Sequence, residues 1–335
     1  MRVFITGISG LLGSTMARFL IHQGGYEVVG VDNMIGGVEG NVPEGAEYHR
    51  GDILDTELLK NIMKDCDVVF HTASLPYEGL SVFSPTITAS SIVSGTISTA
   101  IAALHNKVRL FINCSSMARY GHQTPPFTED MPTAPVDPYG LAKVQAEQHL
   151  EMLSQIHGLQ YVTVVPHNVI GTGQRFYDPF RNVVGIMINR CLHHKPIIVY
   201  GDGEQKRSFS NVYDCIRAVH RIMESTRTDL CGQVYNIGPD ENEITIKELA
   251  YKVGHFCQVY PNLQHFPDRP TEVKNAFCSS EKVRKEWNYN ASITVDQTIK
   301  EMVDWIRPIK RDFEYHLPLE LVNETTPKTW TDKLI

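Results

Sequence analysis

The sequence predicts an α/β fold in which a doubly wound parallel sheet is combined with a smaller, interwoven α/β domain. The first observation behind this prediction is that short β-branched runs alternate with helical patterns up to about residue 165. The second is that several of these runs are apolar throughout, as strands buried on both faces of a sheet must be. The third is a change after residue 166, where irregular segments with Gly and Pro interrupt the periodic pattern.

The individual elements follow from these patterns. Strands are expected where the β-branched runs lie, at residues 3–5, 27–31, 67–70, 108–112, 161–165 and 234–237. Helices are expected where apolar residues recur with helical spacing, at residues 11–23, 85–106, 138–157, 182–193, 211–225, 246–257 and 295–306. Because strand and helix alternate in the first half, each pair is expected to form a parallel unit with its helix on a face of the sheet.

Three parts of the chain are expected from this organisation. Residues 1–166 form the sheet domain, to which a later segment at about 210–240 returns. Residues 167–307 form most of the smaller domain, in which irregular segments are dispersed between helices. Residues 308–335 carry three prolines and scattered apolar residues, among them Trp330, and are expected to form an extended C-terminal arm. This arm either lies on its own subunit or reaches a partner subunit.

Composition and charge exclude several classes of protein. With 38 acidic and 31 basic residues, a net charge of -7 and no long basic block, the chain is not expected to bind nucleic acid. Its seven cysteines form no CxxC pair and its 14 histidines form no HxxxH motif, so neither disulfides nor a metal site is expected. The N-terminus lacks the pattern of a signal peptide, and no run of 18 apolar residues is present. We therefore expect a soluble, cytoplasmic protein without a membrane partner.

A glycine-rich turn joins the first expected strand to the first expected helix. Gly7, Gly10 and Gly13 form a GxxGxxG pattern, which lets the backbone turn tightly and approach a pyrophosphate at the N-terminus of the helix. The next strand ends at Asp32, whose carboxylate can bind both hydroxyls of an adenosine ribose and repels a 2′-phosphate. The pattern predicts a Rossmann-type domain that binds NAD rather than NADP. The alternative is a structural glycine turn followed by a helix-capping aspartate.

Ser116, Tyr139 and Lys143 form a second group of candidate residues. Tyr139 and Lys143 are four residues apart on an expected helix, so the lysine ammonium can lie near the tyrosine oxygen. Ser116 follows an apolar strand at the carboxyl edge of the sheet, where ligands of such folds bind. A tyrosine with a pKa of about 10 is a poor base at neutral pH, so Lys143 and a positive nicotinamide ring are expected to lower that pKa to about 7. The alternative is a surface tyrosine beside a solvated lysine.

Nine short motifs follow one another along residues 1–307. In chain order they are TGISGLLG, Asp32, Asp52-Ile53, HTAS, CSSMARYG, DPYGLAK, PHNVIGTGQ, GDGEQKRSF and DRPTEV. In this order they resemble the extended short-chain dehydrogenase/reductases, and they are most similar to NAD-dependent nucleotide-sugar epimerases such as UDP-glucose and UDP-N-acetylglucosamine 4-epimerases. The resemblance implies an enzyme that inverts C4 of a UDP-hexose or UDP-N-acetylhexosamine through a 4-keto intermediate.

The resemblance also implies roles for individual residues. Tyr139 takes the proton from the sugar 4-hydroxyl, Ser116 binds the same oxygen, and Lys143 holds the nicotinamide ribose. The implied cofactor-binding residues are Gly7, Gly10, Leu11, Leu12, Gly13, Asp32, Asn33, Asp52, Ile53, Thr72, Ala73, Ser74, Tyr139, Lys143 and His167. The implied substrate-binding residues are Ser116, Met117, Asn168, Asn182, Val183, Tyr200, Arg207, Arg269, Glu272 and Ala276. Among these, Arg207 and Arg269 would grip the diphosphate and Glu272 the nucleoside ribose.

Some positions depart from the family pattern. Ile92 stands where an Asn is common, and Pro76 stands in a loop at the sugar where some epimerases carry Lys or Gly. Sugar 4,6-dehydratases carry Asp-Glu directly after the hydroxyl residue, where this chain has Met117 and Ala118, so dehydration is disfavoured. A nucleotide-sugar 4-reductase or dehydrogenase is the enzymatic alternative, and a non-catalytic NAD-binding sensor is the alternative from another class.

Two further expectations concern assembly and substrate size. A homodimer is expected through helices 85–106 and 138–157, because the first is dense in small residues that permit close packing and the second carries a separate apolar face. The alternative is that the small residues pack on the sheet. Ala276 aligns with a bulky Tyr of epimerases restricted to non-acetylated hexoses, so UDP-N-acetylhexosamines are expected to be accepted as well.

Overall fold

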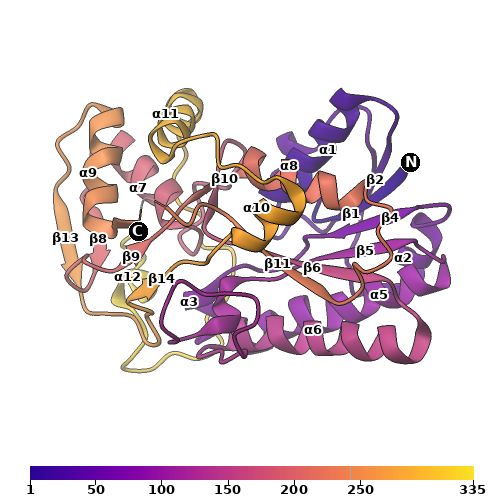
Figure 1. Cartoon of the computed structure of the whole chain (residues 1–335). Coiled ribbons are helices and arrows are strands. Elements are labelled where there is room, and N and C mark those ends of the chain that lie inside the picture. The colour runs from indigo at the N-terminus through magenta and orange to yellow at the C-terminus, as the bar shows by residue number, and fades with distance from the viewer. Residues whose placement is uncertain (242) are drawn as a thin grey trace.

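The structure, a computed structural model, describes residues 1–241 and 243–335. Its main sheet has seven strands in the order β11-β6-β5-β4-β1-β2-β3, and every neighbouring pair is parallel (Figure 1). The strands are β1 (Arg2–Thr6), β2 (Glu27–Asp32), β3 (Glu47–Arg50), β4 (Val68–His71), β5 (Leu110–Cys114), β6 (Tyr161–Pro166) and β11 (Gln233–Ile237). The predicted α/β fold is confirmed. Since the chain reverses direction across the sheet between β1 and β4, a crevice opens at the carboxyl ends of these two strands.

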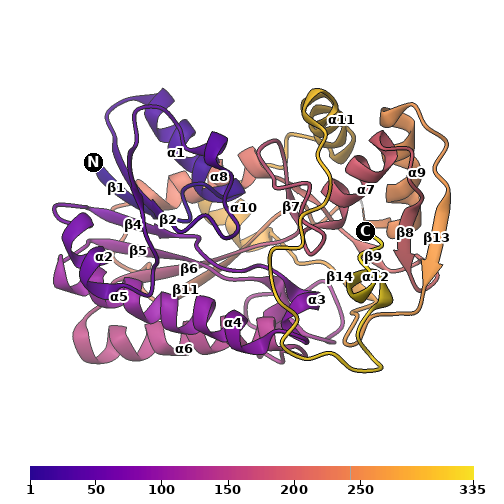
Figure 2. The same cartoon turned by 180° about the vertical axis from the view of Figure 1, so that it is seen from behind.

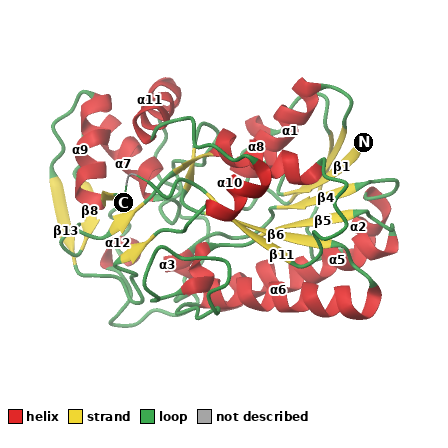
Figure 3. Cartoon of the chain, viewed as in Figure 1, coloured by secondary structure: helices red, strands yellow, loops and turns green. Residues whose placement is uncertain are grey.

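Helices cover both faces of this sheet (Figures 1 and 3). One face carries α1 (Leu11–Gln23), α8 (Val212–Met223) and α10 (Glu281–Trp287), and the other carries α2 (Thr56–Ile62), α5 (Gly95–His105) and α6 (Pro138–His157). Alternate side chains of β1 enter the two cores, since Val3 and Ile5 pack with α1 and α8 whereas Phe4 packs with α2 and α5. Burial on both faces explains why β1 carries apolar residues on both of its sides.

The helix expected at residues 85–106 is divided. It consists of α4 (Pro85–Ala89), a π-helical turn (Ser90–Ser94) and α5. By length and composition the stretch Pro85–His105 could cross a membrane, but 50% of its most apolar window is buried inside the protein. Ala100, Ala102 and Ala103 are fully buried in the core on this face of the sheet, so these small residues pack within the subunit.

The smaller domain, called the cap below, has its own apolar core. Its helices are α7 (Val183–Leu192), α9 (Ile246–Cys257) and α11 (Val295–Ile306). Its strands form the pair β8 (Ile197–Tyr200) and β13 (Leu263–Phe266), the pair β7 (Val169–Ile170) and β10 (Ser210–Asn211), and the set β12 (Ile244–Thr245), β9 (Lys206–Arg207) and β14 (Asn275–Ala276). Between segments of the cap, α8, β11 and α10 return to the main sheet, so the two domains are interwoven.

Several short helical turns connect these elements. They are α3 (Glu78–Ser81), α12 (Lys328–Thr331) and the 3-10 turns Glu39–Asn41, Met117–Tyr120 and Arg307–Ile309. After the turn Arg307–Ile309, the C-terminal arm, which contains α12, runs across both domains (Figure 2). The backbone N–H of Leu321 donates to the carbonyl of Phe83 at 2.9 Å, and the hydroxyls of Tyr200 and Thr329 lie 2.6 Å apart. The arm therefore binds the sheet domain near α4 and the cap near β8.

Candidate active site

A cavity of about 690 Å³ lies between the carboxyl ends of the main sheet and the cap. Most of the residues that the sequence indicates for catalysis, cofactor and substrate line this one cavity. Those in its wall are Gly7, Gly10, Leu11, Leu12, Asp32, Asn33, Asp52, Ile53, Thr72, Ala73, Ser74, Ser116, Tyr139, Lys143, Asn168, Asn182, Val183, Tyr200, Arg207, Arg269 and Glu272. A ligand at the glycine turn and a ligand at the two arginines therefore share a connected space.

Four indicated residues, Gly13, Met117, His167 and Ala276, lie outside this wall. A side chain at Gly13 would collide with the carbonyl of Gly7, so Gly13 allows the turn to close. The ring of His167 is buried, and its Nε2 lies 3.0 Å from the carbonyl oxygen of Pro239. Gly13 and His167 therefore contact backbone next to the cavity and do not line the cavity themselves.

Met117 and Ala276 belong to an apolar cluster next to the cavity. Ala276 is 7% exposed and packs in this cluster with Tyr120, Phe127 and Cys278, and the partly buried Met117 packs against the same cluster. The alignment of Ala276 with a bulky Tyr of other epimerases predicted that its small side chain leaves room for an N-acetyl group of the sugar. In the structure the methyl group of Ala276 instead fills space between apolar side chains, so that steric argument does not apply to the cavity as it stands.

The glycine turn is shaped to receive a pyrophosphate. Gly7 has a φ of +71°, and the Gly10 N–H donates to the Gly7 carbonyl at 2.9 Å, which directs the chain into α1. The Ser9 hydroxyl oxygen is buried and has no hydrogen-bond partner among the described residues. An orphaned hydroxyl beside an open helix N-terminus fits a phosphate oxygen as its missing partner.

Asp32 stands at the end of β2, close to this turn. Its carboxylate accepts hydrogen bonds from the backbone N–H groups of Ser9 at 3.0 Å and Met34 at 2.8 Å. Burial raises the pKa of Asp32, against the lowering effect of these hydrogen bonds. Because a carboxylate has about four acceptor positions, Asp32 can still bind ribose hydroxyls. Nearby, the amide of Asn33 donates to Asp52 at 2.9 Å, which fixes the adjoining wall.

The helix α6 presents Tyr139 and Lys143 to the cavity. Asp137 caps the helix by accepting from the Gly140 N–H at 2.8 Å, and Pro138 occupies the first turn, so Tyr139 lies at the open end. The Tyr139 N–H donates to the Ser81 hydroxyl at 3.1 Å, which joins α6 to α3. Lys143 follows one turn later, and both side chains are buried at the carboxyl edge of the sheet.

Burial dominates the electrostatics that the protein's own groups impose on this pair, before any contribution from a nicotinamide ring. Burial raises the pKa of Tyr139, and the hydrogen bond from Ser116 lowers it only in part. Burial also lowers the pKa of Lys143, whose ammonium donates to the carbonyl of Cys114 at 2.8 Å. Lys143 alone therefore does not bring the pKa of Tyr139 to about 7, because the cost of burying the phenolate is larger.

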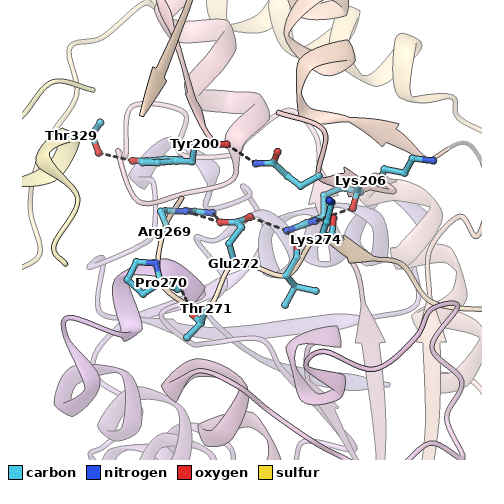
Figure 4. A network of polar contacts seen from close by, with 11 residues as sticks. Tyr200, Lys206, Arg269, Pro270, Thr271, Glu272, Lys274 and Thr329 are labelled. Atoms are coloured by element: carbon cyan, nitrogen blue, oxygen red, sulfur yellow. Dashed lines mark hydrogen bonds and ion pairs between the residues drawn. The ribbon is translucent and has the colours of Figure 1, made fainter. Parts of the chain in front are cut away.

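Glu272 joins two arginines that line the cavity, Arg207 and Arg269, and Figure 4 shows the pair that it forms with Arg269. One carboxylate oxygen accepts from Arg207 at 3.0 Å and the other accepts from Arg269 at 2.7 Å. The guanidinium of Arg269 also lies over the Tyr200 ring, 4.8 Å from its centre. Burial would raise the pKa of Glu272, but the two arginines outweigh it and hold that pKa below its usual value. Glu272 therefore orients both guanidinium groups, and its expected role as an acceptor of ribose hydroxyls stays a prediction.

The model of the NAD dependent epimerase/dehydratase family matches residues 3–238. The chain belongs to this family. Members depend on NAD, and this chain is accordingly an NAD-dependent enzyme that modifies a nucleotide sugar. The glycine turn, the orphaned Ser9 hydroxyl and Asp32 are the residues that fit the adenosine diphosphate part of NAD.

Individual relatives of this family are distant in sequence and close in structure. A putative UDP-glucose 4-epimerase from Methanocaldococcus jannaschii is 28% identical over 91% of this chain and 98% of its own. The UDP-glucose 4-epimerase of Thermotoga maritima, solved with UDP-glucose, has a TM-score of 0.86 at 27% identity and covers 92% of this chain and 99% of its own. The UDP-glucuronic acid 4-epimerase of Bacillus cereus, solved with UDP-glucuronic acid and NAD, has a TM-score of 0.86 at 25% identity and covers 92% and 100%.

The cavity wall of this family member also contains residues that the sequence patterns did not indicate. Arg181 donates to the carbonyl of Gly36 at 3.0 Å and lies 4.8 Å from the centre of the Tyr77 ring. Trp330 of the C-terminal arm and Glu78 of α3 line the cavity as well. Arg181 could have been predicted, because it directly precedes the indicated residue Asn182. Glu78 and Trp330 stand in no motif. Among the described residues, no group of His, Cys, Asp or Glu side chains is arranged to hold a metal ion.

Proposed function

We propose that this enzyme epimerises C4 of a UDP-linked hexose or N-acetylhexosamine through a 4-keto intermediate. The observation that carries the proposal is that Ser116, Tyr139 and Lys143 line the same cavity as Arg207 and Arg269. Bound NAD would supply the hydride acceptor for C4. An enzyme that returns the hydride to the same sugar needs no further acid or base in the cavity.

The residues of the chain have distinct tasks in this proposal. Tyr139 accepts the proton of the sugar 4-hydroxyl and returns it, and Ser116 holds the same oxygen by a hydrogen bond. Lys143 holds the nicotinamide ribose and offers a positive charge 5.8 Å from the centre of the Tyr139 ring. Met117 and Ala118 follow Ser116, so the acid and base that a dehydratase needs at this point are missing from the chain.

The two arginines bind the diphosphate in this proposal. Glu272 neutralises one of their two charges and leaves the pair with a net charge of about +1. A guanidinium fork suits phosphate oxygens, and its orientation by Glu272 reduces the ordering needed on binding. The diphosphate would thereby anchor the substrate while the sugar turns over between the two hydride transfers.

The proposal is tested with purified protein and a panel of UDP-, dTDP-, GDP- and CDP-sugars, without added reductant. Product configuration is followed by NMR and NADH by its absorbance. A C4 epimer formed without net change in NADH supports the proposal. A stoichiometric change in NADH indicates a 4-reductase or dehydrogenase, loss of water indicates a dehydratase, and NAD binding without turnover of any sugar indicates a sensor.

A further inference from the structure

Glu78 places a carboxylate in the cavity at the start of α3. Its side chain is exposed to the cavity, which it lines together with Tyr139 and Arg269. The next residue, Gly79, lies so close to Arg269 that an added Cβ would stand 3.0 Å from its guanidinium. Two residues further, the Ser81 hydroxyl accepts from the Tyr139 N–H at 3.1 Å. The short helix α3 therefore spans from the catalytic tyrosine to the arginine pair, which is the stretch a bound sugar must occupy.

The backbone at Glu78 is fixed by hydrogen bonds on both sides. The Ser81 hydroxyl donates to the Glu78 carbonyl at 2.6 Å. The preceding Tyr77 is buried, and its hydroxyl donates to Asp178 at 2.6 Å. The first bond lies within α3 and the second ties Tyr77 to a distant segment, so the Glu78 carboxylate is presented to the cavity from a well-defined backbone position.

The Glu78 carboxylate has no hydrogen-bond or ion-pair partner within residues 1–241 and 243–335. The charged groups that face it are Asp137 at the N-terminus of α6, Arg207 of β9, and Arg269 and Glu272 of the loop before β14. Desolvation and these carboxylates raise the pKa of Glu78 to about 7. Since Glu272 already occupies both arginines, the acceptor positions of Glu78 are left for a ligand.

We infer that Glu78 selects the sugar: its carboxylate accepts hydrogen bonds from hydroxyl groups of a neutral hexose and repels the carboxylate of a uronic acid. The inference rests on the proposed function, because it requires a nucleotide sugar in this cavity. Two carboxylates brought together in a protein site disfavour each other by far more than in water. A neutral sugar supplies the hydrogen-bond donors that Glu78 lacks, whereas a hexuronic acid adds a second negative charge.

The test compares UDP-glucose with UDP-glucuronic acid in the wild type and in Glu78→Gln, at pH 8 and with NAD bound. Equilibrium dissociation constants from calorimetry and kcat/KM values are both measured. The amide keeps the shape of the side chain and removes its charge. The wild type is expected to prefer UDP-glucose, and Glu78→Gln is expected to reduce that preference on the order of tenfold, mainly through tighter binding of UDP-glucuronic acid. Glu44→Gln, which removes an exposed carboxylate away from the cavity, is the matched control and should leave the preference unchanged.

The results distinguish a wrong role for Glu78 from a wrong proposed function. If the wild type binds both UDP-sugars and Glu78→Gln leaves their ratio unchanged, the role of Glu78 is wrong and the proposed function stands. If the wild type binds neither UDP-sugar, the proposed function fails and this inference fails with it. Glu78→Asp keeps the charge on a shorter side chain, so it is expected to retain discrimination against UDP-glucuronic acid. A loss of discrimination in Glu78→Asp equal to that in Glu78→Gln would contradict the charge argument.

Discussion

The ammonium group of Lys143 donates a 2.8 Å hydrogen bond to the carbonyl oxygen of Cys114, the last residue of β5. This bond fixes the lysine charge at the carboxyl edge of the sheet, 5.8 Å from the centre of the Tyr139 ring. Burial raises the pKa of Tyr139, so its hydroxyl is protonated at neutral pH unless positive charge stabilises the phenolate. Lys143 is a fixed source of such charge beside the ring.

Lys143→Met is therefore expected to move the rising limb of the kcat profile to higher pH. Loss of the positive charge raises the pKa of Tyr139 further, so a higher pH is needed to form the phenolate. The measurement is kcat from pH 6 to pH 10 with saturating NAD, because the same change is expected to weaken cofactor binding. Lys300→Met, at an exposed lysine of α11, serves as the control. A profile that keeps its position after Lys143→Met would remove the lysine from the tuning of Tyr139.

Tyr139→Phe is expected to lower kcat by about 10²–10⁴-fold, since a positioned acid/base contributes that much. The fold is expected to persist, because the buried ring is kept and the backbone bond from Tyr139 to Ser81 does not involve the hydroxyl. Thermal unfolding and bound NAD are measured alongside turnover. Tyr260→Phe, which alters a tyrosine that is 87% exposed, should change none of these quantities. Residual activity above about a tenth of the wild type would exclude Tyr139 as the acid/base.

Local sequence patterns were sufficient for six of the seven strands of the main sheet and for the glycine turn, whereas β3 at its edge was missed. Strands such as β4 and β6 are rich in Val and buried along nearly their whole length because helices cover both of their faces, and this burial leaves a direct mark on the sequence. The two-residue strands β7, β9, β10, β12 and β14 leave no such mark, because their pairing depends on distant segments. The π-helical turn at Ser90–Ser94 was missed for the same reason, since the local sequence there reads as ordinary helix.

The candidate site was predictable where function lies in a short motif. Tyr139 and Lys143 share a helix face through their spacing, and the arginines stand in recognisable segments. Glu78 and Trp330 line the cavity only because the folded chain brings them there. Trp330 lies in the C-terminal arm, which follows the last motif. Ala276, in contrast, stands next to a motif but packs in an apolar cluster outside the cavity wall. An aligned position in a strand does not reveal which way its side chain points in the folded chain.

Trp330→Ala is expected to raise KM for the nucleotide sugar more than it lowers kcat. The indole is 4% exposed, lines the cavity and makes edge contacts with Phe83 and Phe180 at ring-centre distances of 5.9 Å and 5.4 Å. The indole lies beside Gly79, as Arg269 does, so its loss opens the cavity wall next to an expected diphosphate ligand and costs about 3–5 kcal/mol of stability. Trp305→Ala, which removes an indole outside the cavity wall, should destabilise the protein without a selective rise in KM. Equal kinetic effects in both variants would show that the arm acts through stability alone.

The outer surface of α6 supports the expected homodimer. Leu141, Met152 and Ile156 are 48%, 58% and 73% exposed on this helix, and Ile101 of the neighbouring α5 is 38% exposed. Exposed apolar residues gathered on adjacent helices are typical of an interface between subunits. Light scattering is expected to give twice the chain mass of 37.8 kDa, and Met152→Glu with Ile156→Glu is expected to shift the protein toward the monomer. A monomeric wild type at micromolar concentration would contradict the prediction.

Ala276→Tyr is expected to destabilise the enzyme and to reduce turnover of UDP-glucose and UDP-N-acetylglucosamine to a similar degree. Ala276 is 7% exposed and packs with Phe127, Tyr120 and Cys278, so a phenol ring there overfills a packed cluster at a cost of about 1–3 kcal/mol. The alignment with epimerases that carry Tyr at this position predicted a selective loss of the acetamido substrate instead. Melting temperatures and kcat/KM for both substrates distinguish the two outcomes, with Ala276→Val as a smaller step in volume. A selective loss would mean that the cluster opens onto the sugar when substrate binds, whereas a shared loss leaves selection of the sugar to the loop that carries Pro76 and Glu78.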